Sequence, residues 1–222
     1  MTKMTEYPRG TFSWVDLATT DPGAAKEFYS ELFGWEYQDN PAGPDMVYSL
    51  CQLQGEPVAG LSGMMPDMEA QGVPPHWTSY ITVENVDESI ERAEALNGKN
   101  LMGPYDAVDA GRMAMIQDPG GAIFAIWQAK NHIGAHIVNE PGTLCWNELY
   151  CNDVEAAKGF YTELLGWGSH TADMGGGHLY TSVMVGERPN GGMMEIQKEW
   201  GEIPPHWGVY FAVSDCDGTI DQ

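Results

Sequence analysis

Basic residues are scarce in this chain. Ten lysines and arginines stand against 32 aspartates and glutamates, so the 222 residues carry a formal net charge of −22, spread along the sequence. A surface of this sign repels nucleic acids and anionic membranes, and neither is expected as a partner. No run approaches the roughly 20 apolar residues that cross a bilayer, and the N-terminus lacks the apolar core of a signal peptide. We therefore expect an acidic, cytoplasmic protein.

Cysteines are also few. The four that occur form no C-x-x-C pair, and none has a matching position in the internal repeat described below. A disulfide framework or a zinc site should recur with the repeat, so we expect free thiols that serve in packing. A glycine-rich phosphate loop before a helix, a nucleophile elbow and an H-E-x-x-H motif are likewise missing from the sequence. The usual signals for nucleotide binding, serine hydrolysis and zinc proteolysis are therefore absent.

What the sequence does contain is a long internal repeat. The octapeptide GTFSWVDL that starts at Gly10 returns as GTLCWNEL at Gly142, and AAKEFY from Ala24 returns as AAKGFY from Ala156, both 132 residues later. The tetrapeptide PPHW at 74–77 returns at 204–207. A period of this length indicates two copies of one globular domain rather than a solenoid. We place the first domain at 1–130, a linker at 131–141 and the second domain at 142–222.

Each copy opens with a pattern typical of a strand and a helix. Alternation places Trp14, Asp16 and Ala18 on one face of the first strand. A helix then begins after Asp21 and ends at Gly34, and its counterpart lies between 153 and 166. Further strands are expected near 46–52, 57–64, 77–83, 113–116 and 123–127, with a second helix over 87–97. The fold class is α+β, built from half-sized units that must pair to cover their sheets.

These residues resemble a known family. The segment 28–35, which reads FYSELFGW, and the DPGG turn at 118–121 are similar to the vicinal oxygen chelate superfamily of glyoxalase I, bleomycin-resistance proteins and extradiol dioxygenases. The duplication and the repeated PPHW look like its two-domain, glyoxalase-like bacterial branch. The resemblance implies tandem domains of paired βαβββ modules, whose curled mixed sheets surround a cup. It also implies that a divalent metal usually sits at the base of that cup.

The metal positions implied by the resemblance hold unsuitable side chains. They fall on Trp14 and Trp146 of the first strands, on Ala125, and at or near Thr78 and Gly208. Indole and methyl groups cannot bind a hard divalent ion, which needs carboxylate oxygen or imidazole nitrogen. The sequence therefore predicts that the usual metal site is lost and that no cofactor is needed. A divalent metal on shifted ligands is the alternative.

Two carboxylates and two histidines could still carry chemistry on the predicted cup face. Asp16 and Glu148 lie two residues beyond the lost ligand position and are the candidate catalytic groups. His76 and His206 could join them, or could merely bond the backbone after Pro-Pro. Aromatic walls and the pliable GMM segments at 63–65 and 192–194 suggest a pocket for flat or apolar molecules, against the plainer interpretation of ordinary core. The candidate ligand-binding residues are Trp14, Tyr48, Met64, His76, Trp77, Trp146, Tyr180, Met193, His206 and Trp207.

Three functions fit this sequence. We favour a protein that binds a small, partly apolar or aromatic molecule in the cup without the usual metal. The alternatives are a metal-dependent lyase, isomerase or dioxygenase of the glyoxalase type with shifted ligands, and a non-catalytic scaffold. The partner is a small molecule, and the protein is a monomer with paired internal domains or a homodimer. Because 83–90 matches 213–220, the second copy ends before its final strands, so we expect an omitted segment or a sheet edge open to a partner.

Overall fold

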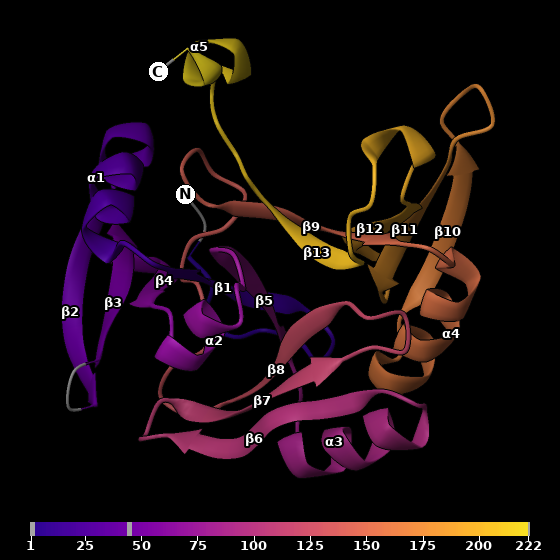
Figure 1. Ribbon diagram of the computed structural model, residues 1–222, viewed down its shortest axis with the longest axis horizontal. Coiled ribbons are helices and arrows are strands. Elements are labelled where there is room, and N and C mark those ends of the chain that lie inside the picture. The colour runs from indigo at the N-terminus through magenta and orange to yellow at the C-terminus, as the bar shows by residue number, and fades with distance from the viewer. Residues whose placement is uncertain (1–2, 44–45, 222) are drawn as a thin grey trace.

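The computed structural model describes residues 3–43 and 46–221, and its strands form two sheets (Figure 1). The first sheet has eight strands in the order β2-β3-β4-β1-β5-β8-β7-β6, and the second has five in the order β10-β11-β12-β9-β13. The first-sheet strands, in chain order, are β1 (Phe12–Thr19), β2 (Glu36–Gly43), β3 (Met46–Leu53), β4 (Glu56–Gly63), β5 (His76–Thr82), β6 (Lys99–Ala107), β7 (Gly111–Gln117) and β8 (Ile123–Ala129). The second-sheet strands are β9 (Leu144–Cys151), β10 (Gly168–Asp173), β11 (Leu179–Val185), β12 (Arg188–Glu195) and β13 (His206–Phe211).

The elements repeat as βαβββ modules, which confirms the α+β class. The helices are α1 (Pro22–Phe33), α2 (Pro66–Ala70), α3 (Val86–Ala95), α4 (Val154–Leu165) and α5 (Cys216–Ile220), with a 3₁₀ turn at Lys198–Trp200. Within each complete module the first and last strands pair in parallel, as β1–β4, β5–β8 and β9–β12. The strands β2, β6 and β10 are absent from the sequence prediction. Their side chains are mostly exposed at or near the sheet edges, so no buried face marks them in the sequence.

The caps expected for the first helix of each half are present. The Asp21 side chain accepts a hydrogen bond from the Ala24 amide at 2.9 Å, and Gly34 ends α1 in the left-handed conformation with φ of 71°. Asp153 and Gly166 do the same for α4. Both helices therefore start and stop where the sequence predicts.

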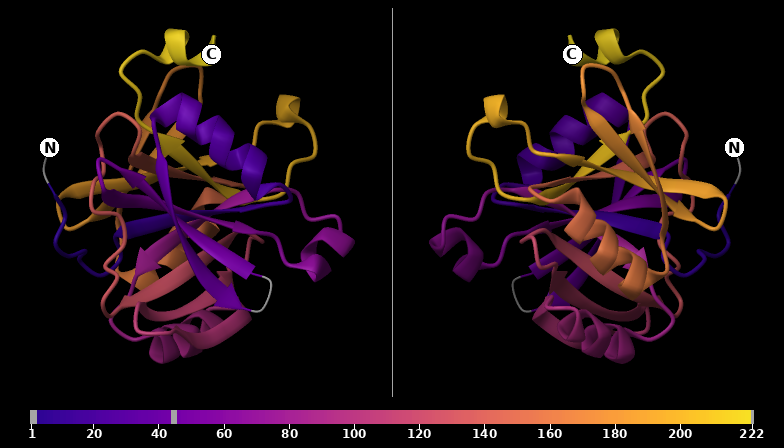
Figure 2. Two further views of the ribbon diagram at one scale, coloured as in Figure 1. Left: turned by 90° about the vertical axis from the view of Figure 1, so that its left-hand side faces the viewer. Right: turned by 90° about the vertical axis from the view of Figure 1, so that its right-hand side faces the viewer.

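The two halves pack through their helices rather than through their cups. One hydrophobic core joins first-half residues such as Phe12, Ile116 and Phe124 to second-half residues such as Phe160 and Trp167. The right-hand view of Figure 2 shows α4 between the strands of the second sheet and α3 of the first half. The domain boundaries drawn from the repeat stay a prediction, because the two sheets share this core.

One tryptophan from each half forms a hydrogen bond to the other half. The Trp35 indole N–H donates to the Gly142 carbonyl at 2.8 Å, and the Trp167 indole N–H donates to the Gly10 carbonyl at 2.7 Å. Each glycine lies two residues before the first strand of its half, at 10 and 142, with φ near 80° in both. The repeated glycines and tryptophans of the sequence thus form a matched pair of contacts between halves.

The two helices differ in how much they bury. Five residues of α4 are buried, whereas α1 has none, and Phe28 on α1 is 56% exposed. Buried Tyr161 on α4 accepts a hydrogen bond from Trp207 at 2.9 Å and donates one to Asp118, also at 2.9 Å. Its counterpart Tyr29 accepts from Trp77 at 3.1 Å. Burial raises the pKa of Asp118, and the Tyr161 hydroxyl and backbone amides counter that effect.

The cysteines and the helix lengths bear on two simpler expectations. The four cysteines are free thiols, with Cys51 and Cys151 buried in packing positions. No helix in residues 3–43 or 46–221 is both long and apolar enough to cross a bilayer.

Removing the hydroxyl of Tyr161 should cost far more stability than removing that of Tyr29. Tyr161→Phe leaves the Asp118 carboxylate and the Trp207 indole N–H buried without this partner, so we expect a loss of about 2–3 kcal/mol. Tyr29→Phe leaves a less buried indole unpaired and should cost about 1 kcal/mol or less. Urea unfolding of the two variants measures both values. Equal losses would show that the link from Asp118 to Tyr161 does not stabilise the interface.

Candidate functional site

The concave face of the first sheet is set by the register between β1 and β5. Trp14 lies opposite Tyr80, Asp16 opposite Thr78, and Ala18 opposite His76. Because side chains alternate along a strand, these residues share one face, which is the face turned away from α1. The predicted orientation of Trp14 and Asp16 matches this register.

A carboxylate held by tyrosines occupies the middle of this face. The Tyr80 hydroxyl donates to Asp16 Oδ2 at 2.6 Å, and the Tyr48 hydroxyl approaches the same oxygen at 3.4 Å. The Trp14 indole N–H in turn donates to the Tyr48 hydroxyl at 2.9 Å. The four side chains form one connected hydrogen-bond network.

The second half repeats the network. The Tyr180 hydroxyl donates to Glu148 Oε2 at 2.6 Å and the Tyr210 hydroxyl to Oε1 at 3.1 Å. The Trp146 indole N–H donates to Tyr180 at 2.8 Å. A further tyrosine, Tyr150, hydrogen-bonds Tyr210 through their hydroxyls. The repeat in sequence is therefore also a repeat of side-chain chemistry.

Two glycines make room for these tyrosines. A Cβ at Gly60 would lie 2.0 Å from the Tyr48 hydroxyl oxygen, and one at Gly192 would lie 1.9 Å from that of Tyr180. Gly60 pairs with Asp16 and Gly192 with Glu148, so these two glycines correspond to each other. The sequence interpretation that matched Gly63 to Gly192 is wrong by three residues.

Burial governs the titration of Asp16. Removal from water raises the pKa of this carboxyl from near 4 to about 6, although the hydrogen bonds from Tyr80 and Tyr48 and the charge of His76 lower it. A carboxyl with this pKa exchanges its proton close to neutral pH. Within residues 3–43 and 46–221, no lysine or arginine forms an ion pair with Asp16 or Glu148.

Aromatic and sulfur-containing side chains line the floor of the first cup. Trp14, Tyr80, Met113 and Trp127 pack in one buried cluster, which the linker residue Ala135 completes. The ring of linker residue His132 meets Trp14 edge-on at 4.5 Å, and burial lowers the pKa of His132 to about 4. Residues of the linker thus pack against the aromatic cluster at the base of the first cup.

Sequence reasoning missed several of these residues. Tyr80 and Tyr210 recur 130 residues apart, three positions after the tryptophan of each PPHW motif. That spacing is the signal that could have identified them. Met113 and Trp127 carry no such signal, since positions 130 residues later would lie beyond Gln222.

Three predicted ligand-binding residues lie on the wrong face. Trp77 packs against Tyr29 and Phe211, with its indole N–H bonded to Tyr29. Trp207 and Met193 are buried in the core around α4, at 5% and 1% exposure. Each is one residue out of phase with the cup-facing positions, so these three predictions are corrected to core residues.

The remaining predicted residues take simpler places. His76 and His206 each contact the carbonyl oxygen of the proline two residues earlier, Pro74 and Pro204, at 2.9 and 2.8 Å. This is the backbone contact expected at a Pro-Pro corner. Both histidines still lie on the cup-facing side of their strands, opposite Ala18 and Tyr150. Met64 follows β4 and is 8% exposed.

The implied metal positions are occupied by side chains that do not fit a divalent ion. Trp14 and Ala125 lie on either side of Tyr80 across β1, β5 and β8, and Thr78, the position expected on β5, lies opposite Asp16. The indole nitrogen of Trp14 is used as a donor, and Ala125 offers only a methyl group. Within the described ranges, no three His, Cys, Asp or Glu side chains cluster as a metal site. Asp16 lies two residues beyond Trp14 on β1, opposite Thr78.

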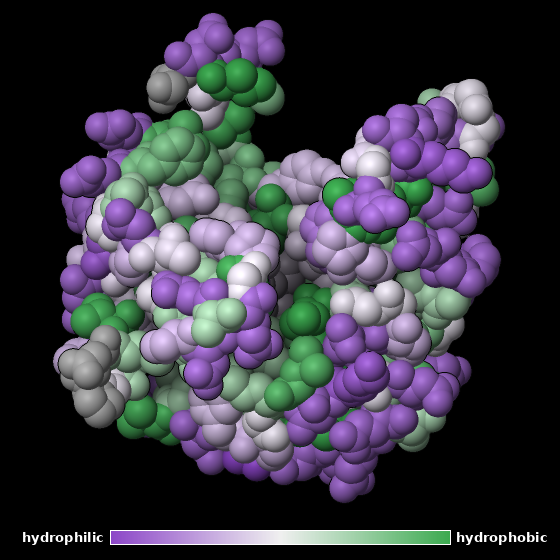
Figure 3. Space-filling model, viewed as in Figure 1, coloured by the Kyte–Doolittle hydropathy of each residue, from purple (hydrophilic) through white to green (hydrophobic). Residues whose placement is uncertain are grey.

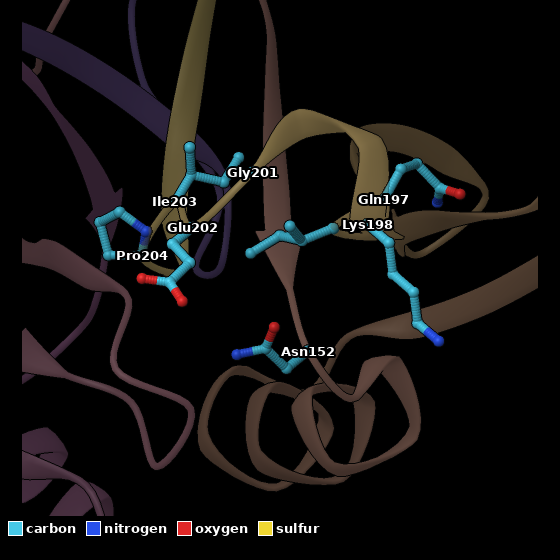
Figure 4. Close-up of a pocket in the computed structure, with 8 residues that line it drawn as sticks. Asn152, Gln197, Lys198, Gly201, Glu202, Ile203 and Pro204 are labelled. Atoms are coloured by element: carbon cyan, nitrogen blue, oxygen red, sulfur yellow. The ribbon is translucent and has the colours of Figure 1, made fainter.

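Two surface cavities lie away from both networks. The first, of about 550 Å³, is lined by Asn152 at the end of β9 and by residues 196–198 and 201–204 of the loop before β13 (Figure 4). The second, of about 460 Å³, lies between residues 84–92 and Arg9. A broader hollow of the surface opens between α1 and the β10–β11 hairpin, above β9 and β13 (Figure 3).

Repeated βαβββ modules, each with its first and last strands paired in parallel, define a distinct class of fold. Comparison with known families makes this assignment specific. The chain belongs to the Glyoxalase/Bleomycin resistance protein/Dioxygenase superfamily, whose sequence profile matches residues 11–126. The resemblance seen in the sequence is thereby confirmed.

Relatives extend over nearly the whole chain. It is 44% identical over 220 residues to "Putative glyoxylase CFP32" of Mycobacterium tuberculosis, an alignment that covers 99% of this chain and 83% of the relative. It is 34% identical over 231 residues to "Anthracycline biosynthesis protein DnrV" of Streptomyces peucetius, with 98% and 82% covered.

Solved structures agree on the fold. The Mn(II)-bound glyoxalase from Novosphingobium aromaticivorans superposes with a TM-score of 0.63 at 17% identity, covering 94% of this chain and 67% of that one. The 2,2',3-trihydroxybiphenyl 1,2-dioxygenase of Sphingomonas wittichii gives 0.61 at 13%, covering 89% and 70%. At these identities the likeness concerns the fold alone.

Gly60→Ala should break the network of the first half. The new methyl group would displace the Tyr48 hydroxyl and separate it from Trp14 and Asp16, so we expect a loss of about 2 kcal/mol or more. Gly63→Ala on the same strand is the matched control, because its Cβ would lie 3.7 Å from the nearest atom, on Pro22. That variant should stay within about 0.5 kcal/mol of the parent. Chemical unfolding measures both, and a neutral Gly60→Ala would contradict the packing described above.

The raised pKa of Asp16 should appear as a pH dependence of stability. A carboxyl whose pKa is higher in the folded than in the unfolded chain stabilises the protein below pH 4, and this contribution is lost as the pH rises through about 6. Relative to Asp16→Asn, the parent should therefore lose about 2 kcal/mol between these values. Unfolding curves measured at several pH values test this, with Glu31→Gln on the exposed face of α1 as the control. Parallel profiles for parent and Asp16→Asn would contradict a raised pKa.

Proposed function

We propose that the first cup binds a flat, partly aromatic small molecule that donates a hydrogen bond to Asp16. The observation that carries this proposal is a half-buried carboxylate that faces the cup and accepts hydrogen bonds from two tyrosine hydroxyls, while no lysine or arginine in residues 3–43 and 46–221 forms an ion pair with it. A buried carboxylate without a cation is costly to keep, so a ligand that supplies a donor would offset part of that cost.

The walls of the cup suit an aromatic ligand. Trp14 and Tyr80 form the floor beside Asp16, and Tyr105 on β6 is 41% exposed, with its pKa raised by burial and by the charge of Asp16. Rings of this kind contact flat ligands over large areas at little cost in side-chain entropy. The name of the Streptomyces peucetius relative, an anthracycline biosynthesis protein, also points to flat aromatic molecules as the ligand class.

Binding in this proposal does not use a metal. The side chains at the implied ligand positions lack free donor atoms, and the Asp16 oxygen is engaged with tyrosine hydroxyls. The Mn(II)-bound glyoxalase shares the fold but only 17% of the residues, so its metal does not carry over by likeness. The lyase or dioxygenase alternative would need other ligands.

The test compares 2-naphthol with 2-methoxynaphthalene, which has the same ring system but no donor. We expect 2-naphthol to bind about tenfold more tightly, and to weaken as the pH falls below about 6 and Asp16 gains its proton. Fluorescence titration measures both affinities. Asp16→Asn should remove the preference for 2-naphthol, whereas Glu148→Gln in the second half should leave it unchanged.

Metal dependence is read from the same titration. Binding that is insensitive to EDTA agrees with the proposal. Loss of binding in EDTA, restored by stoichiometric Mn(II) in the parent but not in Asp16→Asn, would instead establish the metal-dependent alternative. Equal affinity for the two naphthalenes would overturn the role of Asp16.

A further inference from the structure

We propose that the second half carries a separate binding site for an organic ammonium group, formed by Tyr150, Trp200 and Tyr210 in front of Glu148. This site is not a copy of the first cup, because two of its residues have no counterpart there. It does not depend on ligand binding at Asp16.

The site exists because two facing positions differ in size between the two halves. Tyr150 stands where the first half has Ala18, and Gly208 stands where it has Thr78. A Cβ at Gly208 would lie 3.0 Å from the Tyr150 ring, so the missing side chain on β13 accommodates the added ring on β9. The first half pairs a small residue with a larger one, and the second half pairs a large residue with glycine. This complementary change in size indicates that the Tyr150 side chain packs on this face.

Further aromatic rings complete a corner around Tyr150. The Trp200 ring stands at 76° to that of Tyr150 with centroids 5.8 Å apart, and His206 stacks on Tyr150 at 5.1 Å. Trp200 is 42% exposed, so its ring is open to a ligand. Indole and phenol rings meeting at a corner attract a cation through their negative ring faces.

The charge behind the rings favours a cation over a neutral group. Tyr150 bonds Tyr210, which donates to Glu148 Oε1 at 3.1 Å. In the part of the chain that the structure describes, no lysine or arginine pairs with Glu148, whose residue is 8% exposed. A carboxylate behind an aromatic corner therefore lacks a counter-charge. The net charge of −22 adds a long-range attraction for cations.

The aromatic corner selects an alkylated ammonium rather than a metal ion or a bare ammonium. The corner is formed by aromatic rings, and each Glu148 oxygen already accepts a hydrogen bond, from Tyr180 and from Tyr210. A small hydrated ion would find no free oxygen ligands there. An ammonium that carries methyl groups contacts the rings without losing strong hydrogen bonds to water.

Choline and its neutral isostere 3,3-dimethylbutan-1-ol are the probes. We expect choline to bind at least about tenfold more tightly in calorimetry, and to shift the indole N–H resonance of Trp200 in a saturable manner. The preference should persist in about 0.5 M sodium chloride, where attraction to the diffuse surface charge is screened. Equal binding of the two probes would overturn the ammonium assignment, as would a preference that disappears in salt.

Variants locate the site and separate it from the first cup. Trp200→Ala should weaken choline binding about tenfold, and Tyr150→Phe should retain most of it because the ring remains. The double variant Tyr150→Ala with Gly208→Thr restores the pair found in the first half, so it should fold and bind choline no better than the neutral isostere. Asp16→Asn should leave choline binding unchanged. Full affinity in Trp200→Ala and in the double variant would overturn the proposal.

Discussion

Two indole hydrogen bonds between the halves fix where the strands that carry Asp16 and Glu148 begin. Trp35 and Trp167 each reach into the opposite half and hold a glycine carbonyl at the point where a site strand begins. Both glycines take left-handed backbone angles that few other residues adopt without strain. Because β1 carries Asp16 and β9 carries Glu148, each half depends on the other for the placement of its own carboxylate. The cup of one half is therefore set by the helix end of the other.

The carboxylates themselves work against stability. An acid on a central strand loses hydration, which raises its pKa. The hydrogen bonds from the tyrosine hydroxyls offset only part of this effect, so the pKa of Asp16 is raised to about 6. The same arrangement appears twice, each time with a glycine that admits the tyrosine. A protein that needed these positions only for packing could fill them with apolar side chains. The arrangement therefore favours a role in binding.

The sequence predicts the modules and the direction of the first strand better than it predicts the site. The repeat and the alternation of Trp14 and Asp16 are sufficient for that strand, because its buried faces differ clearly. Trp77 and Trp207 were misplaced since the repeated motif that contains them says nothing of which way a strand faces. That choice depends on the register with β1, where Trp77 pairs with Leu17 rather than with Asp16. The prediction for Met193 was wrong for a related reason, because the GMM segments of the two halves were aligned three residues out of register.

The edge strands and Tyr150 mark two further limits of sequence reasoning. The strand β10 is exposed at every residue, so it has no hydrophobic period to detect. The importance of Tyr150 depends on a space at Gly208, 58 positions away in the chain, that only the folded sheet brings beside it. Complementary changes of this kind can be recognised only when the pairing of the strands is known.

The core shared between the halves has a consequence for the order of events during synthesis. Ile116 and Phe124 belong to the first half, yet they are covered by Phe160, Tyr161 and Trp167, which leave the ribosome some forty residues later. Until then α3 covers part of this face, and the apolar side chains that later meet α4 are exposed to water. The core around Ile116 and Phe124 is therefore complete only after α4 has been made.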